Sequence, residues 1–145
     1  MSKVNIVFWS GTGNTAAMAE FIAQGVTEAG GEAVLLPVSE ANVEELKKEK
    51  AFALGCPSMG SEQLEETEME PFMEELEAGI AGKQIALFGS YGWGNQEWMR
   101  DWEDRVSGAG ATVVNGEGIT VNGAPGAETQ AQCMDVGRAL AGLAG

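Results

Sequence analysis

Short apolar runs alternate with longer amphipathic segments along the whole chain. The apolar runs predict strands, and continuous ones such as 85–88 are typical of strands buried on both faces. The predicted strands are 4–9, 32–36, 51–55, 84–90 and 112–114, and 119–121 continues the last strand after a break at Asn115-Gly116. The predicted helices are 15–29, 43–48, 65–78, 96–107 and 128–143. Repeated β-α units predict an α/β protein, a three-layer α/β/α sandwich around a five-stranded parallel sheet.

The bulk composition limits the classes of protein that this chain can represent. Its 145 residues are 44% hydrophobic and contain no linker or repeat, so we expect one domain over 1–145. A net charge of −14 argues against nucleic acid and anionic membranes as partners. No apolar run approaches the roughly 20 residues that span a bilayer. Two isolated cysteines and no signal-peptide pattern favour a reducing cytoplasm.

The first strand leads into a loop of small and hydroxyl residues, which a helix follows. The loop reads Ser10-Gly11-Thr12-Gly13-Asn14-Thr15. A helix N-terminus offers unpaired N–H groups and the positive end of the helix dipole, both of which suit a phosphate. No Lys or Arg occurs between Lys3 and Lys47. The sequence therefore predicts a phosphate site built from neutral donors.

Two further loops should lie beside the first, because ligands of such sheets bind beyond the carboxyl ends of the strands. One reads Cys56-Pro57-Ser58-Met59-Gly60-Ser61-Glu62, and the other reads Ser90-Tyr91-Gly92-Trp93-Gly94. A Met beside a Gly suits contact with a flat, polarizable ligand. A Trp between two glycines is expected at an exposed loop tip, where stacking on a ligand would cover it. Together the loops predict a ligand with a phosphate and a planar ring.

The chain resembles the short-chain flavodoxins, small FMN-binding electron carriers of anaerobic bacteria, along its entire length. The matching segments are Trp9 to Thr15, Gly55-Cys56, Met59-Gly60, Glu70-Pro71-Phe72, Phe88 to Gly94, and Trp98-Met99. The resemblance implies the strand order 2-1-3-4-5, for which flavodoxins are a type example, with FMN at the switch point. It also implies a short chain, since the fifth strand carries no long insertion.

The resemblance assigns cofactor-binding roles to residues of all three loops. The implied set is Ser10, Gly11, Thr12, Gly13, Asn14, Thr15, Ser58, Met59, Gly60, Ser61, Glu62, Ser90, Tyr91, Gly92, Trp93 and Gly94. The first six would hold the FMN phosphate. Met59 and Trp93 would cover the two faces of the ring, and Glu62 would bind it near N3. Ser90 and the backbones of Gly92 and Gly94 would contact the pyrimidine edge.

The resemblance also implies a mechanism. A flipped Gly60 carbonyl would accept the N5 hydrogen of the semiquinone, and the carboxylates that follow Gly60 would oppose the anionic hydroquinone. The expected function is a low-potential one-electron carrier that shuttles FMN between these two states and substitutes for ferredoxin. Low-potential redox proteins would dock on an acidic face around the flavin, and we expect a monomer. Ser61 departs from the Asp that the family often has after this glycine.

Other interpretations fit the residues less well. The pattern Gly11-x-Gly13-x-x-Ala16 is a weak dinucleotide fingerprint, and the second strand ends at Leu36-Pro37 without the acidic residue that NAD binding needs. A Gly-Lys-Ser/Thr loop is missing. With no histidine and no nucleophile–base pair, we expect no enzyme activity and no metal site. A flavin-dependent enzyme and a flavodoxin-like regulatory domain remain the alternatives.

Overall fold

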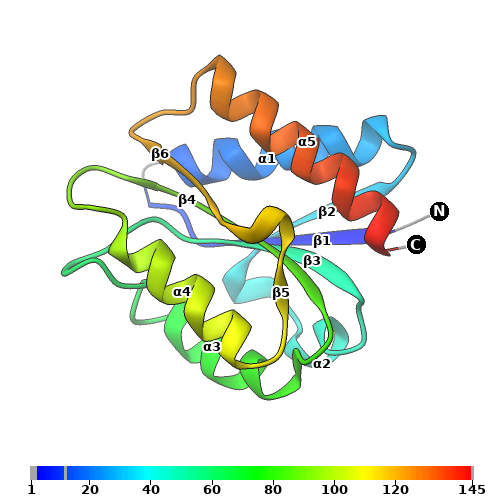
Figure 1. The fold of residues 1–145 in the computed structure, drawn as a ribbon, viewed down its shortest axis with the longest axis horizontal. Coiled ribbons are helices and arrows are strands. Elements are labelled where there is room, and N and C mark those ends of the chain that lie inside the picture. The colour runs from blue at the N-terminus through cyan, green and yellow to red at the C-terminus, as the bar shows by residue number, and fades with distance from the viewer. Residues whose placement is uncertain (1–2, 12, 145) are drawn as a thin grey trace.

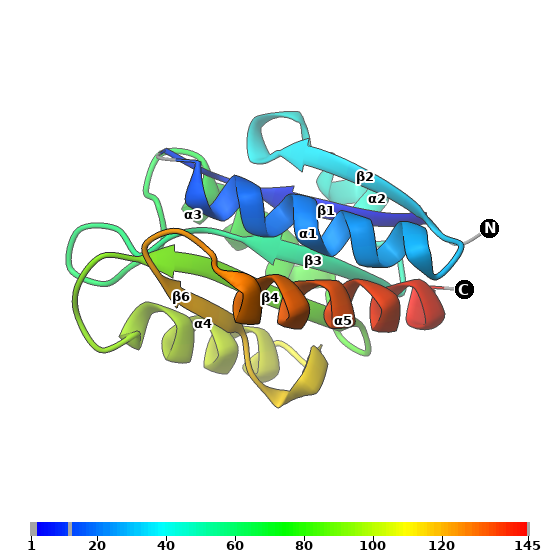
Figure 2. The ribbon, with the colours of Figure 1, turned by 90° about the horizontal axis from the view of Figure 1, so that it is seen from above.

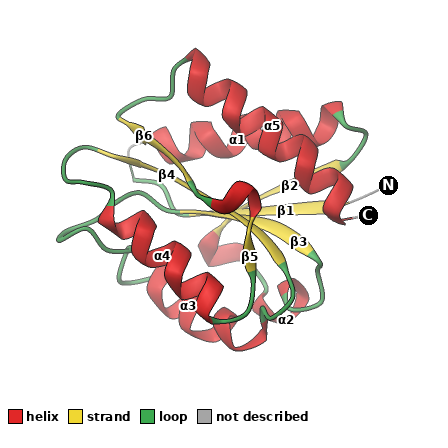
Figure 3. Cartoon of the chain, in the orientation of Figure 1, coloured by secondary structure: helices red, strands yellow, loops and turns green. Residues whose placement is uncertain are grey.

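A parallel sheet lies at the centre of the molecule, with helices on both of its faces (Figures 1 and 3). The computed structural model describes residues 3–11 and 13–144. Within them, six strands form one sheet of order β2-β1-β3-β4-β5, and β6 also pairs with β4. Every pairing is parallel. The α/β/α sandwich and the strand order 2-1-3-4-5 are therefore confirmed.

The elements follow the predicted order along the chain. The strands are β1 (Lys3–Phe8), β2 (Glu32–Pro37), β3 (Ala51–Gly55), β4 (Gln84–Tyr91), β5 (Thr112–Val113) and β6 (Ile119–Asn122). The helices are α1 (Asn14–Glu28), α2 (Val43–Leu46), α3 (Met69–Leu76), α4 (Glu97–Gly108) and α5 (Ala127–Ala144). In the part of the chain described here, no helix is long and apolar enough to cross a membrane.

The fifth position of the sheet is shared by two short strands. β5 pairs with the start of β4 and β6 with its end, so that Thr120 lies opposite Gly89. Between them the chain leaves the sheet, with Asn115 at φ 65° and Gly116 at φ 80°. The predicted break at Asn115-Gly116 and the continuation of the strand after it are confirmed. β6 extends this edge of the sheet to the carboxyl end of β4.

The central strands separate two apolar cores of different character. Side chains alternate along a strand, so Phe52 and Leu54 of β3 point into the core beneath α2, α3 and α4. Ala51 and Ala53 point to the opposite core, which α1 and α5 cover. Small residues on that face leave room for the helices to lie close to the sheet.

Helices α1 and α5 pack against each other through two glycines. A Cβ built on Gly25 would meet the Met134 carbonyl oxygen at 2.0 Å, and one on Gly137 would meet the Ile22 oxygen at 2.1 Å. Both distances are far below van der Waals contact, so neither position has room for a methyl group. The two backbones thus come close enough to seal this face of the sheet above β1.

Substitution of Gly137 by Ala should destabilise the protein, because the methyl group has to push α1 and α5 apart. Overpacking of this kind typically costs about 1–3 kcal/mol of unfolding free energy. Gly142→Ala is the matched control on the same helix, since its Cβ would meet nothing within 4 Å. That change should be neutral or stabilise by about 0.5–1 kcal/mol. Urea unfolding of both variants checks the prediction, and equal stabilities would contradict it.

Candidate functional site

The loops after β1, β3 and β4 gather at one end of the sheet, opposite the two chain ends (Figure 2). Backbone pairing continues past the strand ends: the N–H groups of Trp9, Cys56 and Ser58 donate to the carbonyls of Gly55, Phe88 and Ser90, each at 3.0 Å. A hollow of about 270 Å³ opens between the loops. It is lined by Trp9, Gly11, Asn14, Pro57, Ser58, Met59, Ser90, Tyr91, Gly92 and Gly123.

The first loop presents the start of α1 to this hollow. Gly13 caps the helix in the left-handed region at φ 97°, and the first turn contains no acidic residue. The Ser10 Oγ accepts hydrogen bonds from the N–H groups of Gly13 and Ala16, both at 3.2 Å. The Ser10 hydroxyl proton takes no part in these two bonds, so it can donate to another acceptor. The predicted Thr12 lies outside the described residues.

Thr15 and Ser90 join the first loop to β4. Their hydroxyl oxygens lie 3.1 Å apart, and the Ser90 N–H donates to the Thr15 Oγ1 at 3.3 Å. Both residues are buried. The structure thus brings together two predicted site residues that are distant in sequence. The hydroxyl of Thr15 fixes the loop to the sheet, and its role toward phosphate stays a prediction.

The second loop turns back on itself in a tight hairpin. Met59 and Gln63 exchange two backbone hydrogen bonds of 2.9 Å, which close the turn over residues 60–62. Gly60 has φ 49° and Glu62 has φ 55°, whereas Ser61 has no positive φ. A Cβ on Gly60 would meet nothing closer than the Gln63 side chain at 3.9 Å. Backbone conformation, rather than space, is therefore what favours glycine at position 60.

Glu62 connects the second loop to the third. Its carboxylate accepts the N–H of Glu97 at 2.8 Å and the N–H of Asn95 at 3.3 Å, at the start of α4. A carboxylate at a helix N-terminus is favoured by the dipole and by the unpaired N–H groups. The two loops that should face a planar ring are thereby held at a fixed separation. The predicted contact of Glu62 with the ring stays a prediction.

Glu65 organises the chain between the hairpin and α3. Its buried carboxylate accepts the N–H groups of Thr67, Glu68 and Met69 at 2.7–3.0 Å, and also the Thr67 hydroxyl. Burial raises the pKa of this carboxyl, but the hydrogen bonds outweigh burial and lower it below its usual value. The predicted helix start at residue 65 is wrong for this reason. Residues 65–68 form a carboxylate-centred turn, and α3 begins at Met69.

Trp98 fixes the end of β3 to α4. Its indole N–H donates to the Cys56 carbonyl at 3.0 Å, and its ring lies against Tyr91 with centroids 5.8 Å apart. The Cys56 thiol is fully buried, and burial raises its pKa to about 12. The thiol is therefore protonated and unreactive at neutral pH. Trp98 is buried and belongs to the core beneath α2, α3 and α4.

The third loop carries the most exposed aromatic side chain of the site. Trp93 is 63% exposed, as expected for a loop tip, and exposed glycines flank it. Gly94 has φ 88°, and a Cβ there would meet the Glu62 carboxyl carbon at 2.6 Å. Gly94 thus allows the loop to pass close to Glu62, while the indole beside it remains free to cover a ligand.

A family model described as flavodoxin matches residues 6–137 of the chain. A flavodoxin of Clostridium beijerinckii is 48% identical over 140 residues, which cover 97% of this chain and all of that protein. A flavodoxin of Megasphaera elsdenii is 44% identical over 138 residues, which cover 95% of this chain and 98% of that protein. The chain belongs to the flavodoxin family.

Solved flavodoxin structures agree with this assignment. The solution structure of two-electron reduced Megasphaera elsdenii flavodoxin superposes with a TM-score of 0.86 at 41% identity, covering 96% of this chain and 98% of that one. A flavodoxin from the domain Archaea gives 0.85 at 29% identity, with coverages of 97% and 96%. Flavodoxins are electron-transfer proteins rather than enzymes, and the cofactor is FMN.

The hollow also contains residues that sequence reasoning did not assign to an FMN site. Trp9, Pro57 and Gly123 line it but were not predicted to bind the cofactor. Trp9 carried a usable signal, because it directly follows a strand whose carboxyl end faces the site. Gly123 carried none, since only the pairing of its N–H with the Tyr91 carbonyl at 2.9 Å brings it there.

Glu65→Gln should make the stability of the protein less sensitive to acid. The charged carboxylate binds its N–H donors more strongly than an amide does, so the variant should lose about 1–2 kcal/mol of unfolding free energy at pH 7. Because the pKa is lowered in the folded state, this difference should hold above the ordinary value of 4.5 and disappear as the pH falls through the lowered one. Urea unfolding between pH 3 and pH 8 measures it.

Glu74→Gln serves as the control for this experiment. Glu74 lies exposed on α3 and carries the same charge. Removal of the Glu74 charge should change the unfolding free energy little at any pH. This variant should therefore show no stability difference from the unmodified protein that disappears at low pH. If Glu65→Gln and Glu74→Gln gave the same pH profile, the assigned role of Glu65 would be wrong.

Proposed function

We propose that the chain is a low-potential one-electron carrier whose non-covalently bound FMN shuttles between semiquinone and hydroquinone. In this role it accepts electrons from a strongly reducing donor and substitutes for ferredoxin. It acts as a monomer, with residues 1–145 as one flavodoxin-like domain. Membership of the flavodoxin family supports electron transfer with FMN, and the charges around the hollow support the finer assignment.

The phosphate end of the site is assigned to the loop between β1 and α1. The backbone N–H groups at the start of α1 and the hydroxyl of Ser10 are donors without formal charge. Gly11 and Asn14 line the same hollow. Neutral donors hold a phosphate without placing a cation next to the ring that takes up the electron.

The absence of basic residues from the three loops is the observation that carries the low potential. No Lys or Arg occurs in 4–46, 51–82 or 84–99. Arg100 and Arg105, which come next, are both paired with carboxylates. Glu62 and Glu65 are fixed in the loop that faces the ring, and their charges raise the free energy of an added negative charge nearby. Each reduction that leaves the cofactor anionic is thereby disfavoured.

The ring end of the site is assigned to Met59 and Trp93, one on each face. FMN supplies the one-electron chemistry, and the protein controls what surrounds it. The hairpin at Gly60 supports a role for its carbonyl as the acceptor of the proton at N5, because a glycine at φ 49° can change conformation at low cost. A hydrogen bond that forms in only one redox state of FMN stabilises that state relative to the others. This difference separates the potentials of the first and second reduction steps.

The acidic surface is proposed as the docking face for redox partners. Glu66, Glu68, Glu97 and Asp101 are exposed on the loops and helix starts beside the hollow. With a net charge of −14, the protein would attract partners that surround their own redox centre with basic residues. Such attraction orients the exposed Trp93 edge toward the partner before contact.

Glu68→Gln should raise the lower of the two FMN potentials. Glu68 is exposed and shares a shallow hollow with Trp9 and Ser10, so its charge lies near the site. An exposed charge contributes about 0.2–1 kcal/mol, which corresponds to roughly 10–40 mV for one electron. Glu32 begins β2, at the end of that strand away from the hollow that Pro37 and Glu68 line. Glu32→Gln should therefore leave the potential unchanged. A redox titration followed by absorbance measures both variants.

Two outcomes of that titration would contradict the proposal. One is a single two-electron transition in the unmodified protein with no one-electron intermediate. The other is an equal response to Glu68→Gln and Glu32→Gln, because the local carboxylates would then have no special influence on the cofactor.

Electron transfer to a small basic haem protein should slow as salt is added. At about 10 mM ionic strength the Debye length is about 30 Å, and at 0.1 M it is about 10 Å, so steering weakens over this range. Stopped-flow mixing of the reduced protein with oxidised partner measures the second-order rate constant. A rate that does not depend on ionic strength would argue against docking through the acidic face.

A further inference from the structure

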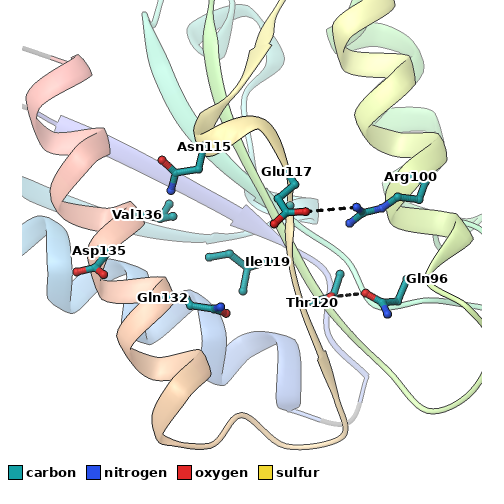
Figure 4. A pocket seen from close by; sticks show the side chains of 10 residues that line it. Gln96, Arg100, Asn115, Glu117, Ile119, Thr120, Gln132, Asp135 and Val136 are labelled. Atoms are coloured by element: carbon teal, nitrogen blue, oxygen red, sulfur yellow. Dashed lines mark hydrogen bonds and ion pairs between the residues drawn. The ribbon is translucent and has the colours of Figure 1, made fainter.

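The third loop ends in a residue whose backbone conformation is unfavourable. Gln96 precedes α4 at φ 67°, in the left-handed region that residues other than glycine seldom adopt. Its side chain makes no capping hydrogen bond to the helix. Instead its amide oxygen accepts a hydrogen bond from the Thr120 hydroxyl at 2.6 Å (Figure 4). The side chain thus leaves its own helix and reaches a strand.

Thr120 is held in the sheet by the pairing of β6 with β4. It lies in β6, opposite Gly89 and immediately before the position that pairs with Ser90. A Cβ on Gly89 would meet the Cys56 carbonyl oxygen at 2.1 Å, so β4 lies very close to the end of β3 here, and β6 pairs with β4 at the same level. The Gln96–Thr120 contact therefore ties the end of the loop to a strand that pairs with β4 beside the site.

The contact complements the one that Glu62 makes. Glu62 binds the N–H groups of Asn95 and Glu97, the two residues that flank Gln96. Thr120 binds the side chain of Gln96 itself. The end of the loop is thereby held from the second loop and from β6, while Trp93 near its tip remains 63% exposed. These contacts fix the position from which the loop extends over the hollow.

We propose that the Gln96–Thr120 hydrogen bond positions the third loop for FMN, which rests on the proposed function of this site. Neither residue lines the hollow at which FMN binds, so both act through the loop. Ordering the loop before the cofactor arrives removes an entropic cost from binding. The pair therefore tightens FMN binding and slows FMN release.

A second link between α4 and the same edge of the sheet serves as an internal comparison. Arg100 lies one turn further along α4 and pairs with Glu117 at 3.5 Å. Figure 4 shows both links at one wall of a cavity of about 390 Å³, with Gln132 and Asp135 of α5 across from them. The side chains of Arg100 and Glu117 are 46% and 71% exposed, so water screens the pair. It also lies further from the loop.

The test compares FMN binding in variants of the two links. Thr120→Val removes the donor at nearly constant shape, and Gln96→Ala removes the acceptor. Each should weaken FMN binding about two- to tenfold, the range expected for one neutral hydrogen bond, with a matching rise in the FMN release rate. Thr120→Ser keeps the hydroxyl, so this variant should bind FMN with the affinity of the unmodified protein. Fluorescence titration of the FMN-free protein and stopped-flow release measure these values.

The double variant and two controls separate positioning from a general loss of stability. If the two residues act through one contact, Gln96→Ala with Thr120→Val should be no weaker than the worse single variant. Glu117→Gln should leave FMN affinity within twofold of the unmodified protein. Urea unfolding of each FMN-free variant establishes that it is folded under the titration conditions, so that a lower affinity reports on the site.

The proposal is overturned if Thr120→Val binds and releases FMN as the unmodified protein does, or if the two single effects simply add. It is also overturned if Glu117→Gln weakens binding as much as Thr120→Val. A failure of the proposed function gives a different result, because the unmodified protein would then show no one-electron intermediate on reduction, whatever the variants do to FMN affinity.

Discussion

Pairing of backbone groups beyond the ends of β1 and β3 is the constraint on which the site depends. The N–H groups of Trp9, Cys56 and Ser58 still reach a neighbouring carbonyl after the strands have ended. The loops after β1 and β3 consequently leave the sheet in register with the neighbouring strand, beside the end of β4 where the third loop begins. Side chains then add contacts between loops, such as Thr15 to Ser90 and Glu62 to the start of α4. These side-chain contacts form because the backbone pairing at the strand ends already places the loops side by side.

The acidic residues of the second loop are bound by backbone N–H groups at the starts of two helices. Carboxylates near a hollow in a protein of charge −14 repel one another. Glu62 and Glu65 offset that repulsion by binding backbone N–H groups at the starts of α4 and α3. The positive ends of these helices stabilise negative charge locally. The negative charge on which the proposed low potential depends is thus built into the structure of the loop.

Sequence patterns predicted those parts of the molecule that depend on local periodicity. Continuous apolar runs located the strands, including the small Ala51–Gly55 strand, and the break at Asn115-Gly116 was anticipated from its turn residues. The start of α3 was not, because a helical pattern of apolar residues says nothing of the turn that the Glu65 carboxylate organises. Gln96 at positive φ was equally unpredictable, since its partner Thr120 is brought there only by the fold.

Within the site, chemistry was easier to predict from sequence than geometry. The roles of loop 10–15, Met59-Gly60 and Trp93 toward a ligand were inferred from residue type, order and a family resemblance, and they stay predictions. That Ser10 would accept from the N–H groups of α1, and that Thr15 would pair with Ser90, depended on distances that no sequence pattern contains. Residue types indicate which groups a site needs, and the folded backbone decides which of them bind one another.

The buried state of the cysteines has a practical consequence for studying this protein. Burial raises the pKa of Cys56 and of Cys133 to about 12, so both sulfurs are protonated and shielded at neutral pH. Maleimide and iodoacetamide reagents require an accessible thiolate. A cysteine introduced on the rim of the hollow would therefore be labelled selectively in the native background. Fluorophores or spin labels placed there can report the distance to a bound partner without removal of either natural thiol.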